Sequence, residues 1–520
     1  MRDGAFDCDV LVVGGGLIGL GAAMFLAQQG LRSWLVERHT SISIHPKARG
    51  VSVRSMELYR AAGIESAVRA AGEGRVEMAI GDNLAGEYQQ VMTPAEDQTR
   101  RWLSPTTFCA CDQHQIEPVL RARATELGAR LFFNTTATQI AQDDCGVTVE
   151  VVADGTTSAA PSSIRARYLV AADGAKGRIR GDLGIGRHGR PVAGTGLSVL
   201  FDADLEPATR GRGVRTLVSP RAGAIFMKGR DSQTRHWFAV PPREDFDKAD
   251  RESLATKVVP MIRSLVGLPD LQPAVESVMT WQTGAFVADR YRAGRIFLVG
   301  DAAHLMPPYG GLGGNTGVAD AHNLAWKLAA VCDSKAGDEL LDTYESERQP
   351  IAEYTAAQVV RFADNPFELF GRRDMFQLQA VTMGFRYFDE AATRFDPACP
   401  VEDPAHPSGQ PGTRAPHVEL AGEVLSTLDL LDPCGFTFVA ADTSRYIAAL
   451  EGEPIPGVQT RALRRQDITD LATWNVTYAS PAAAGLLIRP DGVTCWRAEP
   501  SHPDPRTAVE QAYARALHHR

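Results

Sequence analysis

The sequence predicts an α/β fold: a Rossmann-like dinucleotide-binding domain with an inserted β-sheet domain, followed by a separate C-terminal α/β unit. An apolar run at 10–13 that enters a Gly-rich turn and then a helical pattern predicts the first domain. Short apolar runs that alternate with Gly and Pro turns over 186–289 predict the inserted sheet. A Pro-, Gly- and His-rich stretch at 399–417 predicts a linker before the last unit.

Length and charge restrict the classes of partner. The chain of 520 residues is about 3.5 times the usual domain length, which predicts two or three domains. Its 54 Lys and Arg against 63 Asp and Glu give a net charge of -9, and without a dense basic run this argues against nucleic acid or a membrane surface as partner. The sequence shows neither a spanning apolar segment nor a signal peptide. We therefore expect a cytoplasmic monomer or homodimer that acts on a small molecule.

The first element is a strand, a glycine turn and a helix. Gly14, Gly16 and Gly19 form a GxGxxG pattern, in which glycines allow the tight turn and let backbone N–H groups approach a pyrophosphate. Glu37 follows Gly19 by 18 residues at the end of the next strand, where a carboxylate can hold ribose hydroxyls. This element predicts a dinucleotide site but does not distinguish NAD from FAD.

A second element follows the inserted sheet. An apolar strand in "GRIFLVGDAAH" ends at Gly300 and Asp301, and a glycine cluster at 310–314 precedes a helix that begins near Asn315. Asp301 can accept hydrogen bonds from ribityl hydroxyls, and the helix N-terminus can face a flavin edge that becomes anionic on reduction. Because a nicotinamide has no ribityl chain, this element favours FAD.

A third element, "YLVAADGAKGRIR", ends an apolar strand at Asp173 and Gly174, with Arg180 after it. With these motifs the chain resembles the class A flavoprotein monooxygenases, the FAD-dependent aromatic hydroxylases of the para-hydroxybenzoate hydroxylase fold, and among them the bacterial polyketide-tailoring hydroxylases. The resemblance covers nearly the whole chain, since "GVSVRSMELYRAAG", "CDQHQIEPVL", "LLDTYESERQPIA", "PGTRAPHVEL" and "LLIRPDGVTCWRA" also look like family segments.

The resemblance implies an organisation and a reaction. It implies an FAD-binding domain over 1–185 and 290–398, a substrate-binding β-sheet over 186–289 and a thioredoxin-like domain over 415–520. It implies non-covalent FAD, NAD(P)H as a transient co-substrate, and O2. In such a reaction hydride reduces FAD, oxygen forms a flavin hydroperoxide, and an electron-rich ring, here a polycyclic phenol such as an aromatic polyketide, attacks its distal oxygen.

The resemblance also implies cofactor contacts, while no catalytic acid or base is assigned. These contacts are Gly14, Gly16, Leu17, Ile18, Gly19, Glu37, Arg38, Lys47, Gln113, Asp173, Gly174, Asp301, Pro308, Leu312, Gly313, Gly314 and Asn315. Lys47 stands where the family usually has Arg; an ammonium has no planar fork, so we expect a looser flavin contact. Gly177 replaces a common Ser, which weakens the inference of an NAD(P)H contact there.

Several residues have both a functional and a structural interpretation. We expect His304 to support the flavin loop rather than to act as a base. His236, Trp237 and Phe238 are candidates for the substrate pocket, although their spacing also suits an ordinary sheet. We expect no metal site, because Cys109 and Cys111 have no further Cys or His pair nearby. The C-terminal unit has no CxxC motif, so we expect a structural or association role for it.

Alternative functions share the flavin motifs. A related enzyme could catalyse Baeyer–Villiger insertion, epoxidation or oxidative decarboxylation. A flavin-dependent halogenase is disfavoured because the WxWxIP motif of that group is absent around the seven Trp residues. From another class, the chain could be a binding protein that FAD stabilises but that does not turn over.

Overall fold

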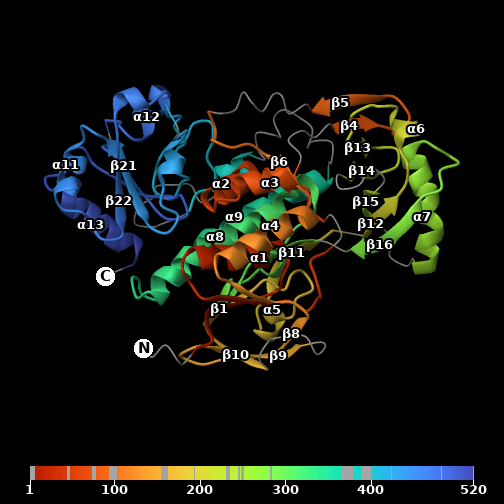
Figure 1. The fold of residues 1–520 in the computed structure, drawn as a ribbon, viewed down its shortest axis with the longest axis horizontal. Coiled ribbons are helices and arrows are strands. Elements are labelled where there is room, and N and C mark those ends of the chain that lie inside the picture. Colours follow the sequence, from red (N-terminus) through yellow and green to blue (C-terminus); the bar gives the residue numbers. More distant parts are fainter. Residues whose placement is uncertain are drawn as a thin grey trace.

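The computed structural model of the chain contains a main body, a second sheet and a C-terminal unit (Figure 1). The structure describes residues 6–43, 47–72, 78–92, 102–153, 162–192, 194–229, 235–243, 246, 251–281, 284–364, 379–387, 400–422, 424–481 and 483–518. No helix among these residues is long and apolar enough to cross a membrane.

A largely parallel sheet forms the centre of the main body. Its path runs β18-β19-β10-β1-β2-β7, and the hairpin of β8 and β9 continues it from β10. The strands are β1 (Cys8–Val13), β2 (Ser33–Val36), β7 (Arg130–Phe132), β8 (Thr135–Gln142), β9 (Val147–Ala153), β10 (Ser163–Ala171), β18 (Arg292–Ala293) and β19 (Ile296–Leu298). The parallel strands β1, β2 and β19 and the second half of β10 consist largely of buried apolar residues, as expected for strands that are covered on both faces.

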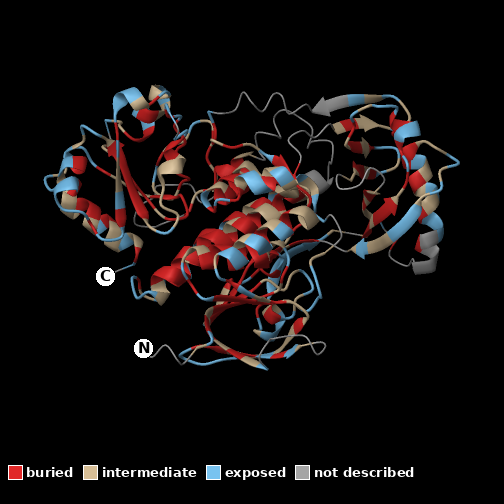
Figure 2. Cartoon of the chain, in the orientation of Figure 1, coloured by how far each residue is buried: buried red, intermediate tan, exposed pale blue. Residues whose placement is uncertain are grey.

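Helices pack against this sheet and against one another. Figure 2 shows buried residues concentrated along the strands and along α1 and α8. The helices of the main body are α1 (Leu17–Gln28), α2 (Val53–Ala61), α3 (Glu65–Ala71), α4 (Gln113–Glu126), α5 (Ile179–Asp182), α8 (Leu312–Cys332) and α9 (Glu339–Asp364). A short pair, β3 (Gly50–Val51) with β6 (Cys109–Ala110), ties the start of α2 to the segment before α4.

The second sheet has seven strands in the order β16-β12-β15-β14-β13-β4-β5. They are β4 (Met78–Gly81), β5 (Tyr88–Met92), β12 (Thr195–Asp202), β13 (Thr216–Ser219), β14 (Ala224–Lys228), β15 (Arg235–Arg243) and β16 (Ala274–Trp281). The sequence predicts that residues 78–92 belong to the FAD-binding domain and that the sheet domain begins at 186. This expectation is wrong, because β4 pairs in parallel with β13 and so belongs to the second sheet. Strand pairing over this sequence distance leaves no local signal.

Helix α7 (Arg251–Val266) covers one face of the second sheet, which we call the outer face (Figure 1). The short α6 (Glu206–Thr209) lies beside it. We call the opposite face, which is turned toward the main body, the inner face. A small sheet of β11 (Arg187–Pro191), β17 (Gly284–Ala288) and β20 (His304–Leu305) joins the two parts of the molecule.

The C-terminal unit is a four-stranded mixed sheet with helices around it, as expected for a thioredoxin-like domain. Its strands are β21 (Phe436–Ala441), β22 (Val458–Leu463), β23 (Leu486–Ile488) and β24 (Thr494–Arg497), and its helices are α11 (Arg445–Gly452), α12 (Leu471–Thr477) and α13 (Pro505–Ala516). The segment expected to be a linker is packed where it is described, since Thr413, Arg414 and Ala415 are buried.

Buried ion pairs connect the C-terminal unit to the main body. The guanidinium of Arg489 contacts Glu347 on α9 at 2.5 Å, and Glu347 also binds Lys327 of α8 at 2.7 Å. Arg414 donates through Nε to Glu57 of α2 at 2.9 Å. Because each charge is matched, these groups can be buried without the cost of an isolated charge.

Candidate functional site

Three loops meet at one edge of the first sheet because parallel strands end at the same side. β1 leads into Gly14, β10 into Asp173, and β19 into Gly300. The loops are therefore adjacent although they are far apart in the sequence. Brought together in this way, the first three sequence motifs form a single site at the carboxyl edge, where ligands of open α/β sheets bind.

Glycine is required in the first loop by close backbone contact. A Cβ on Gly14 would lie 2.2 Å from the carbonyl oxygen of Ala172, and one on Gly19 would lie 1.8 Å from that of Gly14. Gly16, which caps α1, is exposed, and the first turn of α1 has neither a side-chain cap nor an acidic residue. Its N–H groups and helix dipole can therefore face an anionic group such as a pyrophosphate.

Glu37 closes one side of this loop from the end of β2. Its carboxylate accepts the N–H of Gly15 at 2.5 Å and the N–H of His39 at 2.8 Å. Arg38 beside it is exposed. The fixed carboxylate stands where the strand–turn–helix pattern places an acceptor for ribose hydroxyls.

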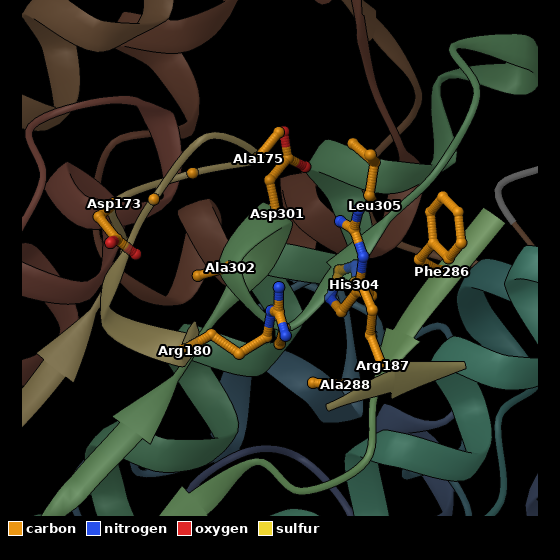
Figure 3. Close-up of a pocket in the computed structure, with 13 residues that line it drawn as sticks. Asp173, Ala175, Arg180, Arg187, Phe286, Ala288, Asp301, Ala302, His304 and Leu305 are labelled. Atoms are coloured by element: carbon orange, nitrogen blue, oxygen red, sulfur yellow. The ribbon is translucent and has the colours of Figure 1, made fainter. Parts of the chain in front are cut away.

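Asp301 lies on a short 3₁₀ turn, Gly300–Ala302, directly after β19. Figure 3 shows it beside a pocket that Asp173, Arg180, Arg187 and His304 also line. The side chain of Asp301 is exposed at the pocket, although protein atoms lie close around its carboxylate. This partial desolvation raises the pKa of Asp301, and the charges of His304 and Lys47 act in the opposite direction. The carboxylate accepts no hydrogen bond from the described residues, so it is available to a hydroxyl-bearing ligand.

His304 belongs to a buried cluster behind this turn. Its Nε2 lies 2.6 Å from Oδ2 of Asp320, and the same oxygen accepts the N–H of Gly300 at 3.3 Å. The other oxygen of Asp320 accepts Nε of Arg348 at 2.8 Å. His304, together with Arg348, lowers the pKa of Asp320 against its complete burial. The geometry gives His304 the task of holding the Asp301 turn.

The start of α8 is fixed by its own side chains. Gly310 and Gly311 adopt left-handed φ angles of 73° and 64°, which turn the chain into the helix at Leu312. Asn315 accepts the N–H of Ser52 at 2.9 Å and donates to the carbonyl of Gly50 at 3.0 Å. A Cβ on Gly314 would lie 3.4 Å from Leu17. The helix start therefore abuts the first loop and the β3 segment.

Ile18 joins two of the loops. Its side chain would be 2.9 Å from a Cβ on Gly300 and 2.8 Å from one on Gly317, so both glycines permit this packing. The resulting set of groups fits FAD: N–H groups at the start of a helix for phosphate, and carboxylates for ribose and ribityl hydroxyls. Oδ1 of Asp173, which is buried and has no hydrogen-bond partner among the described residues, adds a further acceptor.

Comparison with known proteins identifies the family. The model of the FAD binding domain matches residues 7–362, and that of the aromatic-ring hydroxylase C-terminal domain matches 408–519. The chain belongs to the FAD-dependent aromatic-ring hydroxylases. The aklavinone 12-hydroxylase of Streptomyces purpurascens is 36% identical, with 98% of this chain and 99% of that protein covered.

Two further proteins are similar to this chain over almost its whole length. The tetracenomycin B2 monooxygenase-dioxygenase of Streptomyces olivaceus is 36% identical over 98% of this chain and 99% of its own. The crystal structure of aklavinone-11 hydroxylase with FAD and aklavinone has a TM-score of 0.87 and 34% identity, covering 99% of this chain and 100% of that one. The hydroxylase therefore takes FAD as its cofactor.

Three further expected contacts of the hydroxylase lie at the start of α4, before β3 and before α8. Gln113, the first residue of α4, donates to Glu117 at 2.7 Å, and Lys47 is exposed. Pro308 is exposed just before the start of α8, and Pro307 precedes it, buried. Their contacts with FAD stay predictions.

Glu117 is a functional candidate that sequence reasoning missed. It is buried one turn after Gln113, and a Cβ on Gly16 would lie 4.0 Å from its Oε1. Burial raises the pKa of Glu117, while Gln113 and Lys47 oppose this. The i, i+4 spacing of Gln and Glu in "CDQHQIEPVL" was a usable signal. Asp320 and Arg348, which form the buried cluster with His304, carried no such local signal in the sequence.

The three candidates for the substrate pocket divide between the two faces of the second sheet. Phe238 packs with Phe201 and Phe226 in the core against α7, so the expectation that it lines the pocket is wrong. His236 is also buried there and bonds the carbonyl of Ala203 at 3.1 Å. Trp237 points the other way, because successive side chains of a strand alternate, and contacts Leu200 and Met227 on the inner face.

Proposed function

We propose that the hydroxylase uses NAD(P)H and O2 to hydroxylate a polycyclic phenolic substrate, an aromatic polyketide. The observation that carries the proposal is the position of the FAD site at the sheet edge, with the inner face of a second sheet turned toward the same body (Figure 1). Relatives of the same length are named for aklavinone and tetracenomycin B2, which favours hydroxylation of a fused-ring compound over the other oxygenations.

In this proposal the residues of the chain bind FAD and orient the substrate. The N–H groups at the start of α1 hold pyrophosphate, and Glu37 and Asp301 accept hydroxyls at the two ends of the cofactor. FAD, when bound, supplies acceptance of hydride from NAD(P)H and activation of oxygen for transfer to the ring. The apolar inner face excludes water from the reacting groups and holds the ring against them.

NAD(P)H binds transiently in this proposal. Of the two GxGxxG matches in the chain, Gly14–Gly19 stands between a strand and a helix, whereas Gly184–Gly189 runs into β11. Only the first has the context of a dinucleotide fingerprint, so we infer no separate Rossmann domain for the nicotinamide cofactor. The pocket between Asp173 and Asp301 contains Arg180 and Arg187, two cations beside the FAD loops. Arg187 lies 4.3 Å from the ring of Phe286, which orders its side chain.

A substrate panel tests the proposal. The FAD-loaded protein is mixed with polycyclic phenols and quinones while NAD(P)H consumption and product mass are followed together. We expect a gain of one oxygen, and NMR of the product then separates hydroxylation from epoxidation or ring insertion. A protein that consumes no NAD(P)H and makes no hydrogen peroxide with any compound would be a non-catalytic flavoprotein.

A further inference from the structure

We propose that the indole N–H of Trp237 and the hydroxyl of Thr216 are the two polar contacts by which the inner face recognises oxygen substituents of a fused-ring substrate. This inference rests on the proposed function and names how that substrate is oriented. The two residues would set which ring carbon meets the flavin, and they act by positioning rather than by chemistry.

Strand register places the two residues in one row. Thr216 of β13 is opposite Met227 of β14, Met227 is opposite Trp237 of β15, and Trp237 is opposite Leu200 of β12. Directly opposed residues share a face. Leu217, the neighbour of Thr216, packs in the core against α7, so this row lies on the inner face.

Both polar atoms are buried without a partner. Thr216 is 5% exposed and Trp237 is 8% exposed, and neither Oγ1 of Thr216 nor Nε1 of Trp237 has a hydrogen-bond partner in the described part of the chain. By contrast, Trp281, on the same face of the edge strand β16, donates its Nε1 to Ser198 at 3.1 Å. A buried polar group without a partner costs stability, so two in one row point to a ligand that supplies the partners.

The spacing and chemistry of the row describe the ligand. Two strand spacings, roughly 10 Å, separate Thr216 from Trp237, which suits oxygens on different rings of a fused system. An indole N–H only donates, so it requires a carbonyl or phenolic oxygen, whereas a hydroxyl can donate or accept. Met227 between them offers a polarisable thioether to an aromatic surface. The row therefore fits a polycyclic hydroxyquinone.

Two single-residue variants test the inference. Trp237→Phe removes the N–H and keeps an aromatic ring, and Thr216→Val removes the hydroxyl and keeps the shape. With FAD-loaded protein and 1,8-dihydroxyanthraquinone or aklavinone as probes, we expect each variant to raise the Kd roughly three- to tenfold and to change the distribution of products. Anthracene, which has no oxygen, should bind all proteins equally, and Thr216→Ser should restore quinone binding.

A second readout separates recognition from a role in folding. Without a probe, both variants should retain FAD, and Thr216→Val should unfold at or above the wild-type temperature, because it removes a polar atom that the fold leaves unpaired and keeps the shape of the side chain. Wild-type affinity and products in both variants, with an active wild-type enzyme, would overturn the inference alone. A wild-type protein that neither binds nor oxidises any quinone would overturn the proposed function, and the inference with it.

Discussion

His304 and Asp320 are joined by a contact of 2.6 Å between Nε2 and Oδ2, and neither side chain is accessible to solvent. Asp320 lies on α8, whereas His304 follows the Asp301 turn, so the contact fixes the turn against the helix. Arg348 of α9 binds the second oxygen of the same carboxylate at 2.8 Å. One buried aspartate thus holds three elements around the flavin site.

Asp320→Asn tests this arrangement. The substitution removes the charge that compensates buried Arg348, so we expect a loss of about 3–5 kcal/mol in the free energy of unfolding, together with lower FAD content. Chemical denaturation of the flavin-free protein measures the loss. Asp333→Asn is the control, because its pair with Lys335 is exposed and should contribute less than about 1 kcal/mol. Equal effects of the two variants would contradict the prediction.

Asp301 and His304 should differ in what they stabilise. Asp301→Ala should weaken FAD binding more than His304→Ala does, since charge-assisted bonds to hydroxyls contribute about 1.5–3 kcal/mol each. His304→Ala should lower the unfolding temperature of the flavin-free protein more, because it opens a buried cluster. FAD titration and thermal unfolding measure the two effects. Equal FAD affinity in both variants would count against the role of Asp301.

Two glycines on α1 provide a matched pair. Gly19→Ala places a Cβ against the backbone of Gly14, and overpacking of about 1–3 kcal/mol at the pyrophosphate loop should raise the Kd for FAD roughly tenfold. Gly21→Ala meets nothing within 4 Å and should instead stabilise the helix by up to about 1 kcal/mol. FAD titration with thermal unfolding distinguishes them. A Gly19→Ala variant with normal FAD affinity would show that the loop tolerates displacement.

Glu57 should make the junction with the C-terminal unit sensitive to acid. Although burial opposes ionisation, Arg414 leads the groups that lower the pKa of Glu57 from 4.5 to about 2. A depressed carboxyl pKa stabilises the fold fully above the unfolded value of 4.5, and this contribution, on the order of 3 kcal/mol, is lost as the pH falls toward 2.

Glu57→Gln tests this dependence. Urea unfolding should show the variant less stable than wild type at neutral pH, with a difference that shrinks as the pH falls from about 4.5 toward 2. Glu126→Gln is the control, because its pair with Arg123 is exposed and should change little. A difference that stays constant across this range would mean that Glu57 does not titrate as proposed.

The sequence alone was sufficient for the fold class, the family and the cofactor. Gly14, Gly16 and Gly19 after an apolar run, and Gly300 with Asp301 after another, are patterns that are complete within a few residues of sequence. A strand that ends in a glycine turn before a helix needs no distant contact to be recognised. The meeting of these loops followed from the rule that parallel strands end at one edge.

Tertiary structure decided what depends on distant pairing. Residues 78–92 joined the second sheet through β13, and Arg414 found Glu57 across 357 residues of sequence. The alternation of side chains in β15 was compatible with either face being packed against a helix. The position of α7 decided that Phe238 lies on the outer face and Trp237 on the inner face. Period and spacing specify which side chains share a face, but the contacts of that face depend on the element packed against it.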